Sequence, residues 1–368
     1  MRIEKVELRR LRLPLVRPFE TSFARVDDRT FLLVTVHGGG EEGWGECVAE
    51  ATPFYSSETA GTAWHVLKEF LVPMLVGADL DSAAAVWEHV ARVRGNQMAK
   101  AAIEMAAWDL EARQKRVPLW KLLGGDGRPV ASGVSIGIQP SLAALEERVD
   151  ADLADGYKRV KIKIKPGWDI EPARHLRARH PSLLLMVDAN AAYTLDDADH
   201  LSALDELSLM MIEQPLEYDD VGRHAALQKR LRTPVCLDES IHSLGIAEDA
   251  IDRDACRIIN IKPGRVGGHL QSRLVHDLCA ARGIPVWHGG MLESGIGRAH
   301  NLHLSTLPNF TLPGDVAASR RYYAPDLIEP GIEVRSDGTI TVPDGPGIGV
   351  AIVRDRVESA TEEYWCST

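Results

Sequence analysis

The chain has 368 residues, of which 45% are hydrophobic and 26% are charged, and its formal net charge at pH 7 is −11. This length and composition are typical of a soluble globular protein with a large core and favour two domains over one. The acidic charge argues against a nucleic acid or an anionic membrane as a partner, because phosphate binding needs a basic face. A small molecule is therefore the expected ligand.

The cysteines and the N-terminus indicate a cytoplasmic protein. The five cysteines are scattered and show no C-x-x-C spacing, which is typical of reduced thiols. The first 15 residues alternate charged and apolar side chains, unlike a signal peptide. No apolar run approaches the ~20 residues of a membrane span, so we expect no association with a membrane.

The first part of the chain predicts a sheet followed by helices. Residues 1 to about 50 alternate apolar and polar side chains, and the run Gly38-Gly39-Gly40 predicts a turn between two antiparallel strands. From Ser56 to about Leu123 the apolar residues follow a helical spacing. The stretch "GGDGRP" ends this helical block, so we place the first domain at residues 1–127.

The second part of the chain predicts a parallel barrel. Eight short apolar runs, from "VSIGI" to "NFTLPGD", alternate with amphipathic helical segments over residues 128–319. Strands that alternate with helices form right-handed βαβ units, and eight of them fit a closed (β/α) barrel. The tail, residues 320–368, contains short turn-rich strands and is expected to pack back on the first domain.

Five successive runs of the barrel end in a charged residue, at intervals of 24 or 25 residues: Lys163, Asp188, Glu213, Asp238 and Lys262. One βα unit separates each from the next, so we expect them at an equivalent level on the active-site face, where the carboxyl ends of the strands lie. Because side chains alternate across a strand, Lys161 points into the barrel with Lys163. Taken alone, these lysines could equally coat a solvated edge strand, but the shared period with three acids favours a site.

The three acids predict a metal site. Asp188, Glu213 and Asp238 offer only carboxylate oxygens, which favours Mg²⁺ over zinc, with Mn²⁺ as a substitute. Asp188 or Asp238 alone could instead cap the following helix. Three carboxylates at one height would repel one another without a cation between them, so we predict that all three are metal ligands.

The two outer lysines predict acid–base chemistry. Lys163 lies one strand before the acids and Lys262 one strand after them, so they face each other across the mouth of the barrel. We expect one lysine to remove the proton α to a metal-bound carboxylate, which gives an enediolate, and the other to protonate the opposite face. The expected outcome is inversion at the α-carbon.

Six ordered motifs extend this interpretation: "KIKIKPGWD", "VDANAAYTL", "IEQPLEYDD", "CLDESI", "NIKPGRVGG" and "LPNFTLPGD". With them the sequence resembles the enolase superfamily, its muconate-lactonizing-like subgroup, and within it the o-succinylbenzoate synthase and N-succinylamino acid racemase (N-acylamino acid racemase) family. The likeness covers nearly the whole chain. It implies a modified TIM barrel under an α+β capping domain formed by the N-terminal region and the C-terminal tail. It also implies a Mg²⁺-dependent lyase of menaquinone biosynthesis, an isomerase, or both, with a succinylated carboxylate as substrate and a homo-oligomeric assembly.

The resemblance also implies roles for individual residues. Lys163 and Lys262 would be catalytic, and Lys161 would orient the substrate or act electrostatically. Asn190 and Glu239 would support the metal ligands. Substrate contacts would come from Ser135, Phe19, Phe23, Tyr55 and the segment 289–294, which includes Gly290, Met291 and Glu293. The aromatic residues have a core position as their alternative, since most Phe and Tyr side chains are buried.

Other functions stay open at this stage. Asp315 is followed two residues later by Ala317, so the Asp-x-Asp pair of dipeptide epimerases is missing, which disfavours an epimerase. A cycloisomerase, a Schiff-base aldolase and a noncatalytic metal-binding barrel remain as alternatives. His288 is interpreted as a core or pocket-wall residue. Arg320, where many relatives carry an acid, has no assigned effect.

Overall fold

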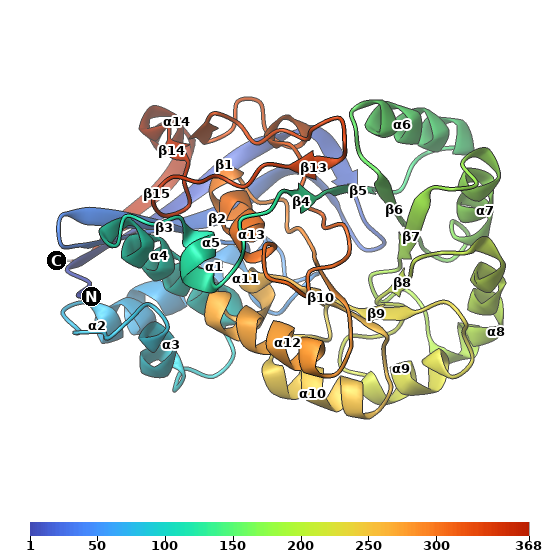
Figure 1. Ribbon diagram of the computed structural model, residues 1–368, viewed down its shortest axis with the longest axis horizontal. Helices are drawn as coiled ribbons and strands as arrows, with labels where there is room; N and C mark the ends of the chain where they lie inside the picture. The colour runs from blue at the N-terminus through green and yellow to red at the C-terminus, as the bar shows by residue number, and fades with distance from the viewer. Residues whose placement is uncertain (368) are drawn as a thin grey trace.

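The computed structural model describes residues 1–367, and its N-terminal part is built on an antiparallel sheet (Figure 1). The strand order is β15-β1-β2-β3. Gly38 ends β2 and the next strand begins at Glu41, so the predicted glycine turn joins two paired strands. β15 comes from the end of the chain and pairs with β1, which brings the tail onto this sheet. The bounds are Lys5–Glu20 for β1, Arg25–Gly38 for β2, Glu41–Cys47 for β3 and Thr361–Cys366 for β15.

One long helix covers this sheet. The helix α4 packs on β3, and Gly43 and Gly45 of that strand face it. A Cβ atom at Gly45 would overlap the carbonyl oxygen of Ala102, so only glycine permits this close approach. The helices here are α1 (Ala60–Val66), the π-helical turn η1 (Leu67–Leu71), α2 (Val72–Leu75), α3 (Ala85–Val90), α4 (Gln97–Gln114) and α5 (Leu119–Leu123).

The second part is a parallel sheet of seven strands in sequential order, β5 to β11, with helices on its outer side (Figure 1). The strands are β5 (Gly133–Ile136), β6 (Arg159–Lys163), β7 (Leu184–Asp188), β8 (Ile212–Glu213), β9 (Val235–Leu237), β10 (Ile258–Ile261) and β11 (Val286–His288). The outer helices are α6 (Leu142–Ala154), α7 (Ile170–Arg179), α8 (Ala198–Leu201), α9 (Val221–Gln228), α10 (Leu244–Asp252), α12 (His269–Ala281) and α13 (Gly295–Leu304), and the short α11 (Pro263–Val266) follows β10.

The eighth predicted strand is not regular. The run "NFTLPGD" forms only two isolated bridges, from Phe310 to Val286 of β11 and from Gly314 to Ser132 beside β5. Pro313 cannot donate to a ladder, which explains why the segment forms no continuous strand. The bridges nevertheless connect the first and last strands, so the ring closes. The expectation of eight regular strands was wrong, whereas the modified barrel is confirmed.

The register of the strands shows that the five charged residues do not all lie at one level, contrary to the expectation from the sequence. Lys163 pairs with Asp188, and Asp188 pairs with Glu213. Glu213 pairs with Cys236, so Asp238 lies two residues further along the chain, just after the end of β9. The register steps again before Lys262, because Ile259 pairs with Leu237. Such steps arise from the tilt and stagger of barrel strands. Equal spacing in the sequence therefore placed these residues on one face, but not in one row.

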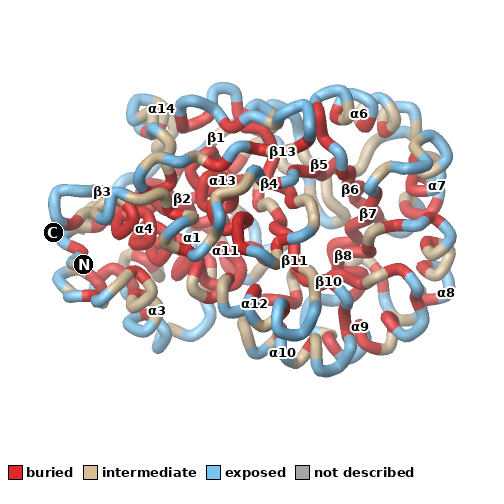
Figure 2. Tube along the Cα trace, viewed as in Figure 1, coloured by how far each residue is buried: buried red, intermediate tan, exposed pale blue. Residues whose placement is uncertain are grey.

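Burial follows the two sheets (Figure 2). The strands of the parallel sheet and the inner faces of the helices are mostly buried, whereas β15 and the second half of β1 are exposed or half-buried. One continuous hydrophobic core runs through both parts. Two small antiparallel pairs, β4 (Val130–Ala131) with β13 (Thr339–Ile340) and β12 (Ile328–Glu329) with β14 (Ala351–Ile352), precede α14 (Arg354–Ala360). Within residues 1–367, none of the helices is both long and apolar enough to span a membrane.

Candidate active site

Three lysines line one small cavity at the carboxyl ends of the barrel strands. Lys161 and Lys163 come from β6, whereas Lys262 follows β10. Three strands separate β6 from β10 in the sheet. The cavity, of about 70 Å³, is bounded by all three side chains. The structure therefore brings the predicted lysines to one space from opposite sides of the barrel.

Each outer lysine is held by a different carboxylate. Lys163 Nζ lies 2.6 Å from Asp188 Oδ2 and donates to it, and it also donates to Asn190 Oδ1 at 2.7 Å. Lys262 Nζ donates to Asp238 Oδ2 at 2.8 Å. Burial disfavours the charged form of Lys262, but Asp238 and Tyr55 outweigh burial and raise its pKa. The two neighbours therefore stabilise the charged form of Lys262.

Lys161 lies among three acids. Its Nζ atom is 2.8 Å from Glu213 Oε2, 2.8 Å from Asp315 Oδ2 and 3.1 Å from Asp188 Oδ2. Burial opposes its charge, but these carboxylates raise the pKa of Lys161 well above its usual range. Lys161 is therefore a fixed positive charge under the cavity.

The three predicted metal ligands are fully buried and close enough to repel one another. Burial raises the pKa of Glu213 well above its usual range, and the charges of Asp188 and Asp238 raise it further. For Asp188, burial also acts upward, but Lys163 and Lys161 outweigh it and lower the pKa. Three like charges in one buried site repel one another, so a bound cation would stabilise the three carboxylates.

The carboxylates of Asp188, Glu213 and Asp238 do not converge on a single point. Within residues 1–367, no group of three or more Asp, Glu, His or Cys side chains has the geometry of a metal site. Lys161 reaches between Asp188 and Glu213, and Arg265 binds Asp238. The donor set fits a hard cation by its chemistry, but cationic side chains of the chain itself contact these carboxylates.

Asn190 and Glu239 connect the lysine to the acids. Asn190 accepts from Lys163, and its Nδ2 donates to Glu239 Oε1 at 2.8 Å. Burial and the neighbouring Asp238 raise the pKa of Glu239 to about 7. Both residues thus lie next to the predicted ligands, where the sequence placed them, although only Asn190 reaches the cavity with the lysines.

Most of the predicted substrate contacts bound the same cavity. Phe19, Phe23 and Tyr55 reach it from the N-terminal part of the chain. Ser135 of β5 bounds it, as do Gly290 and Met291 after β11. Glu293 does not bound it, because its carboxylate turns back to accept from the backbone N–H of Met291 at 2.9 Å. Leu292, within the predicted segment 289–294, bounds it too. The remaining lining residues, which the sequence did not single out as contacts, are Thr21, Val26, Glu50, Asp315 and Tyr322.

Asp315 is the main site residue that the sequence reasoning missed. It is the last residue of the eighth run, and its carboxylate binds Lys161 and, at 2.6 Å, Arg159 Nη1. Burial would raise its pKa, but Arg159 and Lys161 lower it. The position at the end of "NFTLPGD" was the available signal. Nothing in the sequence indicated that Asp315 pairs with Lys161 where the barrel closes.

Arg265 is a second missed residue. It follows Lys262 in "NIKPGRVGG", and its guanidinium binds Asp238 and donates through Nε to the carbonyl of Ile241 at 2.7 Å. Asp238 therefore has two cationic partners, Lys262 and Arg265. Burial acts upward on the pKa of Asp238, and these two partners lower it.

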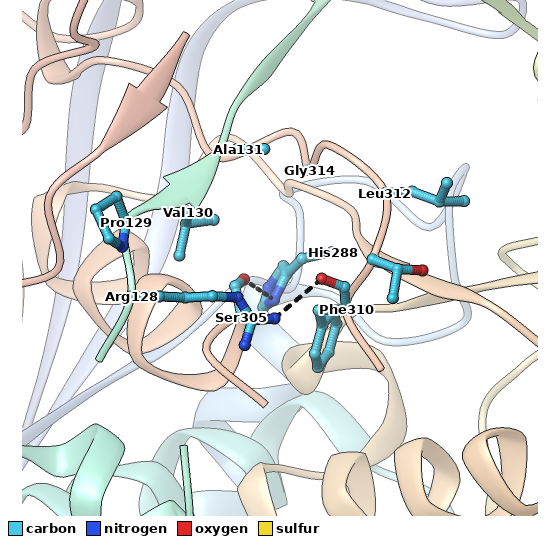
Figure 3. Close-up of a pocket in the computed structure, with 10 residues that line it drawn as sticks. Arg128, Pro129, Val130, Ala131, His288, Ser305, Phe310, Leu312 and Gly314 are labelled. Carbon is cyan, nitrogen blue, oxygen red and sulfur yellow. Dashed lines mark hydrogen bonds between the residues drawn. The ribbon is translucent and has the colours of Figure 1, made fainter. Parts of the chain in front are cut away.

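His288 lies apart from the lysines. It bounds a second cavity of about 310 Å³, on the outer side of the sheet between β4 and the eighth segment (Figure 3). Its ring contacts Ser305 Oγ through Nδ1 at 3.1 Å, and it lies beside Phe310. Burial lowers its pKa to about 3, so the ring is neutral. This location agrees with the interpretation of His288 as a pocket-wall residue.

Two family models together match most of the chain. Residues 5–124 match the N-terminal domain of mandelate racemase and muconate lactonizing enzyme, and residues 144–356 match the enolase C-terminal domain-like family. The first match falls on the antiparallel part, and the second runs from α6 of the barrel into α14 of the tail.

Similar proteins cover nearly the whole chain. An o-succinylbenzoate synthase of Geobacillus kaustophilus is 53% identical over 361 residues, which is 98% of this chain and 96% of that protein. An N-succinylamino acid racemase of Amycolatopsis sp. is 50% identical over 362 residues, 98% of each. The crystal structure of an enolase superfamily member from Listeria innocua superposes with a TM-score of 0.96 at 38% identity and covers 100% of this chain and 99% of that chain. The chain therefore belongs to the enolase superfamily, and within it to the family of o-succinylbenzoate synthases and N-succinylamino acid racemases.

Proposed function

We propose that this protein is an enzyme that removes the proton α to a carboxylate, acting as an o-succinylbenzoate synthase, as an N-succinylamino acid racemase, or as both. The observation that carries the proposal is the placement of Lys163 and Lys262 on opposite sides of one cavity. The relatives at 50–53% identity have these two activities. The substrate is a small carboxylate with a succinyl arm.

In racemisation each lysine serves one face of the α-carbon. One amine takes the α-proton, which leaves an enediolate, and the opposite ammonium delivers a proton to the other face. The substrate thus loses its α-proton to one lysine and gains a proton from the other, which inverts the α-carbon. Lys161, fixed by Asp188, Glu213 and Asp315, holds positive charge toward the substrate carboxylate.

In dehydration one lysine is sufficient. It removes the α-proton and then returns it to the departing hydroxyl group, which leaves as water. The second lysine stays protonated and stabilises the negative charge of the intermediate. Phe19, Phe23 and Met291 give the cavity an apolar part of its wall.

We propose Asp188, Glu213 and Asp238 as ligands of Mg²⁺, with Mn²⁺ as an alternative ion. Their chemistry supports this assignment, because three buried carboxylates offer oxygen ligands and repel one another. When bound, the cation supplies positive charge that stabilises the carboxylate as negative charge develops on it. Asn190 and Glu239 would position these ligands.

The contacts of Asp315 argue against a dipeptide epimerase. Its carboxylate is already bound by Arg159 and Lys161, so it is not free to hold an α-ammonium group. Cytoplasmic location, a role in menaquinone biosynthesis, a homo-oligomeric assembly and the domain bounds 1–127, 128–319 and 320–368 stay predictions.

The proposal is tested with Lys163→Ala and Lys262→Ala. We expect each variant to lose racemisation of N-succinylamino acids, together with α-proton exchange in D₂O for the enantiomer whose proton faces the missing lysine, by about 10³-fold or more, as proton transfer requires a positioned base. NMR measures the exchange for each enantiomer, and absorbance follows dehydration of the cyclohexadiene precursor of o-succinylbenzoate. Near-normal turnover of both substrates in either variant contradicts the assignment. No exchange and no dehydration by the unaltered protein, with metal retained, favours a noncatalytic barrel.

A further inference from the structure

A third cavity lies outside the candidate active site and is rich in arginine. It has a volume of about 100 Å³ and lies between the end of β1, α6 and the segment after the barrel closure. A cavity of roughly 10–15 Å³ already holds one water, so this one has room for several waters or for one small anion. It is lined by Val16, Arg17, Arg148, Asp155, Tyr157, Ala318, Arg320 and Arg321.

The charge of this cavity is unusual for an acidic chain. Four of its lining residues are arginines and one is an aspartate, although the net charge of the protein is −11. Arg148 and Arg321 share the single buried carboxylate of Asp152, with shortest contacts of 2.7 Å and 2.6 Å. Burial lowers the pKa of Arg148, and the charges of Arg321 and Arg17 act in the same direction. The guanidinium groups of Arg17, Arg148 and Arg321 are thus close enough to repel one another. Arg320, in contrast, is paired with Asp155 and Glu333.

Several donors of the cavity have no acceptor. Arg17 is exposed and makes no hydrogen bond or ion pair within residues 1–367. Arg321 Nε is buried and also lacks a partner in that range. The hydroxyl of Tyr157 accepts from the N–H of Ala318 at 3.1 Å, which leaves its own proton free. A buried N–H without an acceptor is costly, and an anionic oxygen would remove that cost.

We propose that this cavity binds a small tetrahedral oxyanion, either free phosphate or the phosphoryl group of a metabolite. Arginine suits such a ligand because its planar fork of N–H donors matches two oxygens of one phosphate. The same Arg321 donates through Nη2 to the carbonyl of Ser135 at 2.8 Å, and Ser135 bounds the candidate active site. The oxyanion therefore lies one side chain away from the reaction cavity. This inference does not depend on the activity proposed above.

The test is calorimetric titration of the full-length protein with inorganic phosphate at constant ionic strength. We expect one saturable site. Arg17→Gln should weaken it about tenfold, because a charge-assisted hydrogen bond is lost. Arg17 has no partner in the protein, so its replacement should leave the fold intact. The matched control is Arg92→Gln, which removes an exposed arginine away from the cavity and should bind phosphate as the unaltered protein does.

A second variant and a second ligand complete the test. Tyr157→Phe removes the hydroxyl, which also accepts from the N–H of Ala318, and should weaken binding. Circular dichroism checks its fold. Glycerol 3-phosphate tests the source of the phosphoryl group: affinity equal to that of phosphate, or tighter, indicates a metabolite, and binding of phosphate alone indicates the free ion. Absence of saturable binding of either ligand, or equal binding by Arg17→Gln and the unaltered protein, overturns the proposal.

Discussion

Tyr55 lies against Lys262, although the two residues come from different parts of the chain. The ammonium of Lys262, after β10, donates to the hydroxyl of Tyr55 at 3.1 Å, and it also lies 4.9 Å from the centre of the tyrosine ring. Burial raises the pKa of Tyr55, so the hydroxyl stays protonated. The N-terminal part of the chain therefore touches one of the two proposed bases directly.

We predict that Tyr55→Phe lowers the turnover number about tenfold, because Lys262 loses one hydrogen bond to its charged form while the ring contact is kept. The Michaelis constant should change little. Deuterium exchange from each enantiomer of an N-succinylamino acid measures the effect, which should be larger for the enantiomer whose α-proton faces Lys262. Tyr364→Phe, at an exposed position of β15, is the control. Equal rates in all three proteins contradict the prediction.

We predict that chelation abolishes activity. Three buried carboxylates that repel one another are the expected ligands of a divalent cation, so EDTA should remove turnover and either Mg²⁺ or Mn²⁺ should restore it. EDTA saturated beforehand with Mg²⁺ is the control for effects of the chelator itself. Full activity after exhaustive chelation, together with trapping of the substrate by borohydride, would instead indicate a Schiff-base aldolase.

The contact between β3 and α4 predicts a strong effect of one methyl group. In Gly45→Ala the new Cβ meets the backbone of Ala102, so strand and helix must separate. We expect a loss of about 2 kcal/mol or more in the free energy of unfolding, measured with urea. Gly222→Ala, in α9, meets nothing within 4 Å and should be neutral or stabilising. Similar stability of the two variants contradicts the close approach of β3 to α4.

Glu104 joins the two parts of the molecule. From α4 its carboxylate accepts from the backbone N–H groups of His269 and Leu270 at 2.8 and 2.9 Å, at the start of α12. It also accepts from Trp108 Nε1 at 2.6 Å. Burial outweighs these bonds and raises the pKa of Glu104 from 4.5 to about 7.

This shift predicts a pH dependence of stability. Because the folded pKa is raised, the stability that Glu104 contributes is fully present below about pH 4.5 and is lost as the pH rises through about 7. Glu104→Gln cannot titrate, so the fall in unfolding free energy between pH 5 and pH 8 should shrink by up to about 3 kcal/mol. Urea unfolding at both pH values measures it. Glu248→Gln, at an exposed position of α10, should keep the slope of the unaltered protein; an unchanged slope in Glu104→Gln contradicts the prediction.

Much of the site could be predicted from the regular spacing of charged residues along the sequence. A repeat of 24 or 25 residues is one βα unit, so it placed Lys163, Asp188 and Glu213 at the ends of adjacent strands. Alternation along β6 placed Lys161 on the inner side with Lys163. These are local rules, and they hold because hydrogen bonding between parallel strands fixes the geometry of neighbours.

Other features could not be read from local rules. Arg265 binds Asp238, and Asp315 binds Lys161, because the barrel closes and α11 turns back toward its mouth. The eighth segment closes the ring with isolated bridges, and no pattern in "NFTLPGD" distinguishes this from a regular strand. The turn of Glu293 away from the cavity is likewise a property of the folded loop.

The sequence by itself determined the strand period, the inward direction of the lysines and the types of charge at the strand ends, because these depend on neighbours along one chain segment. Only the tertiary structure decided which cation binds which carboxylate, how far the register steps between strands, and which side chains of the N-terminal part reach Lys262. Those outcomes depend on contacts between residues as far apart as Tyr55 and Lys262, and on burial, which sets the strength of every charge in the site.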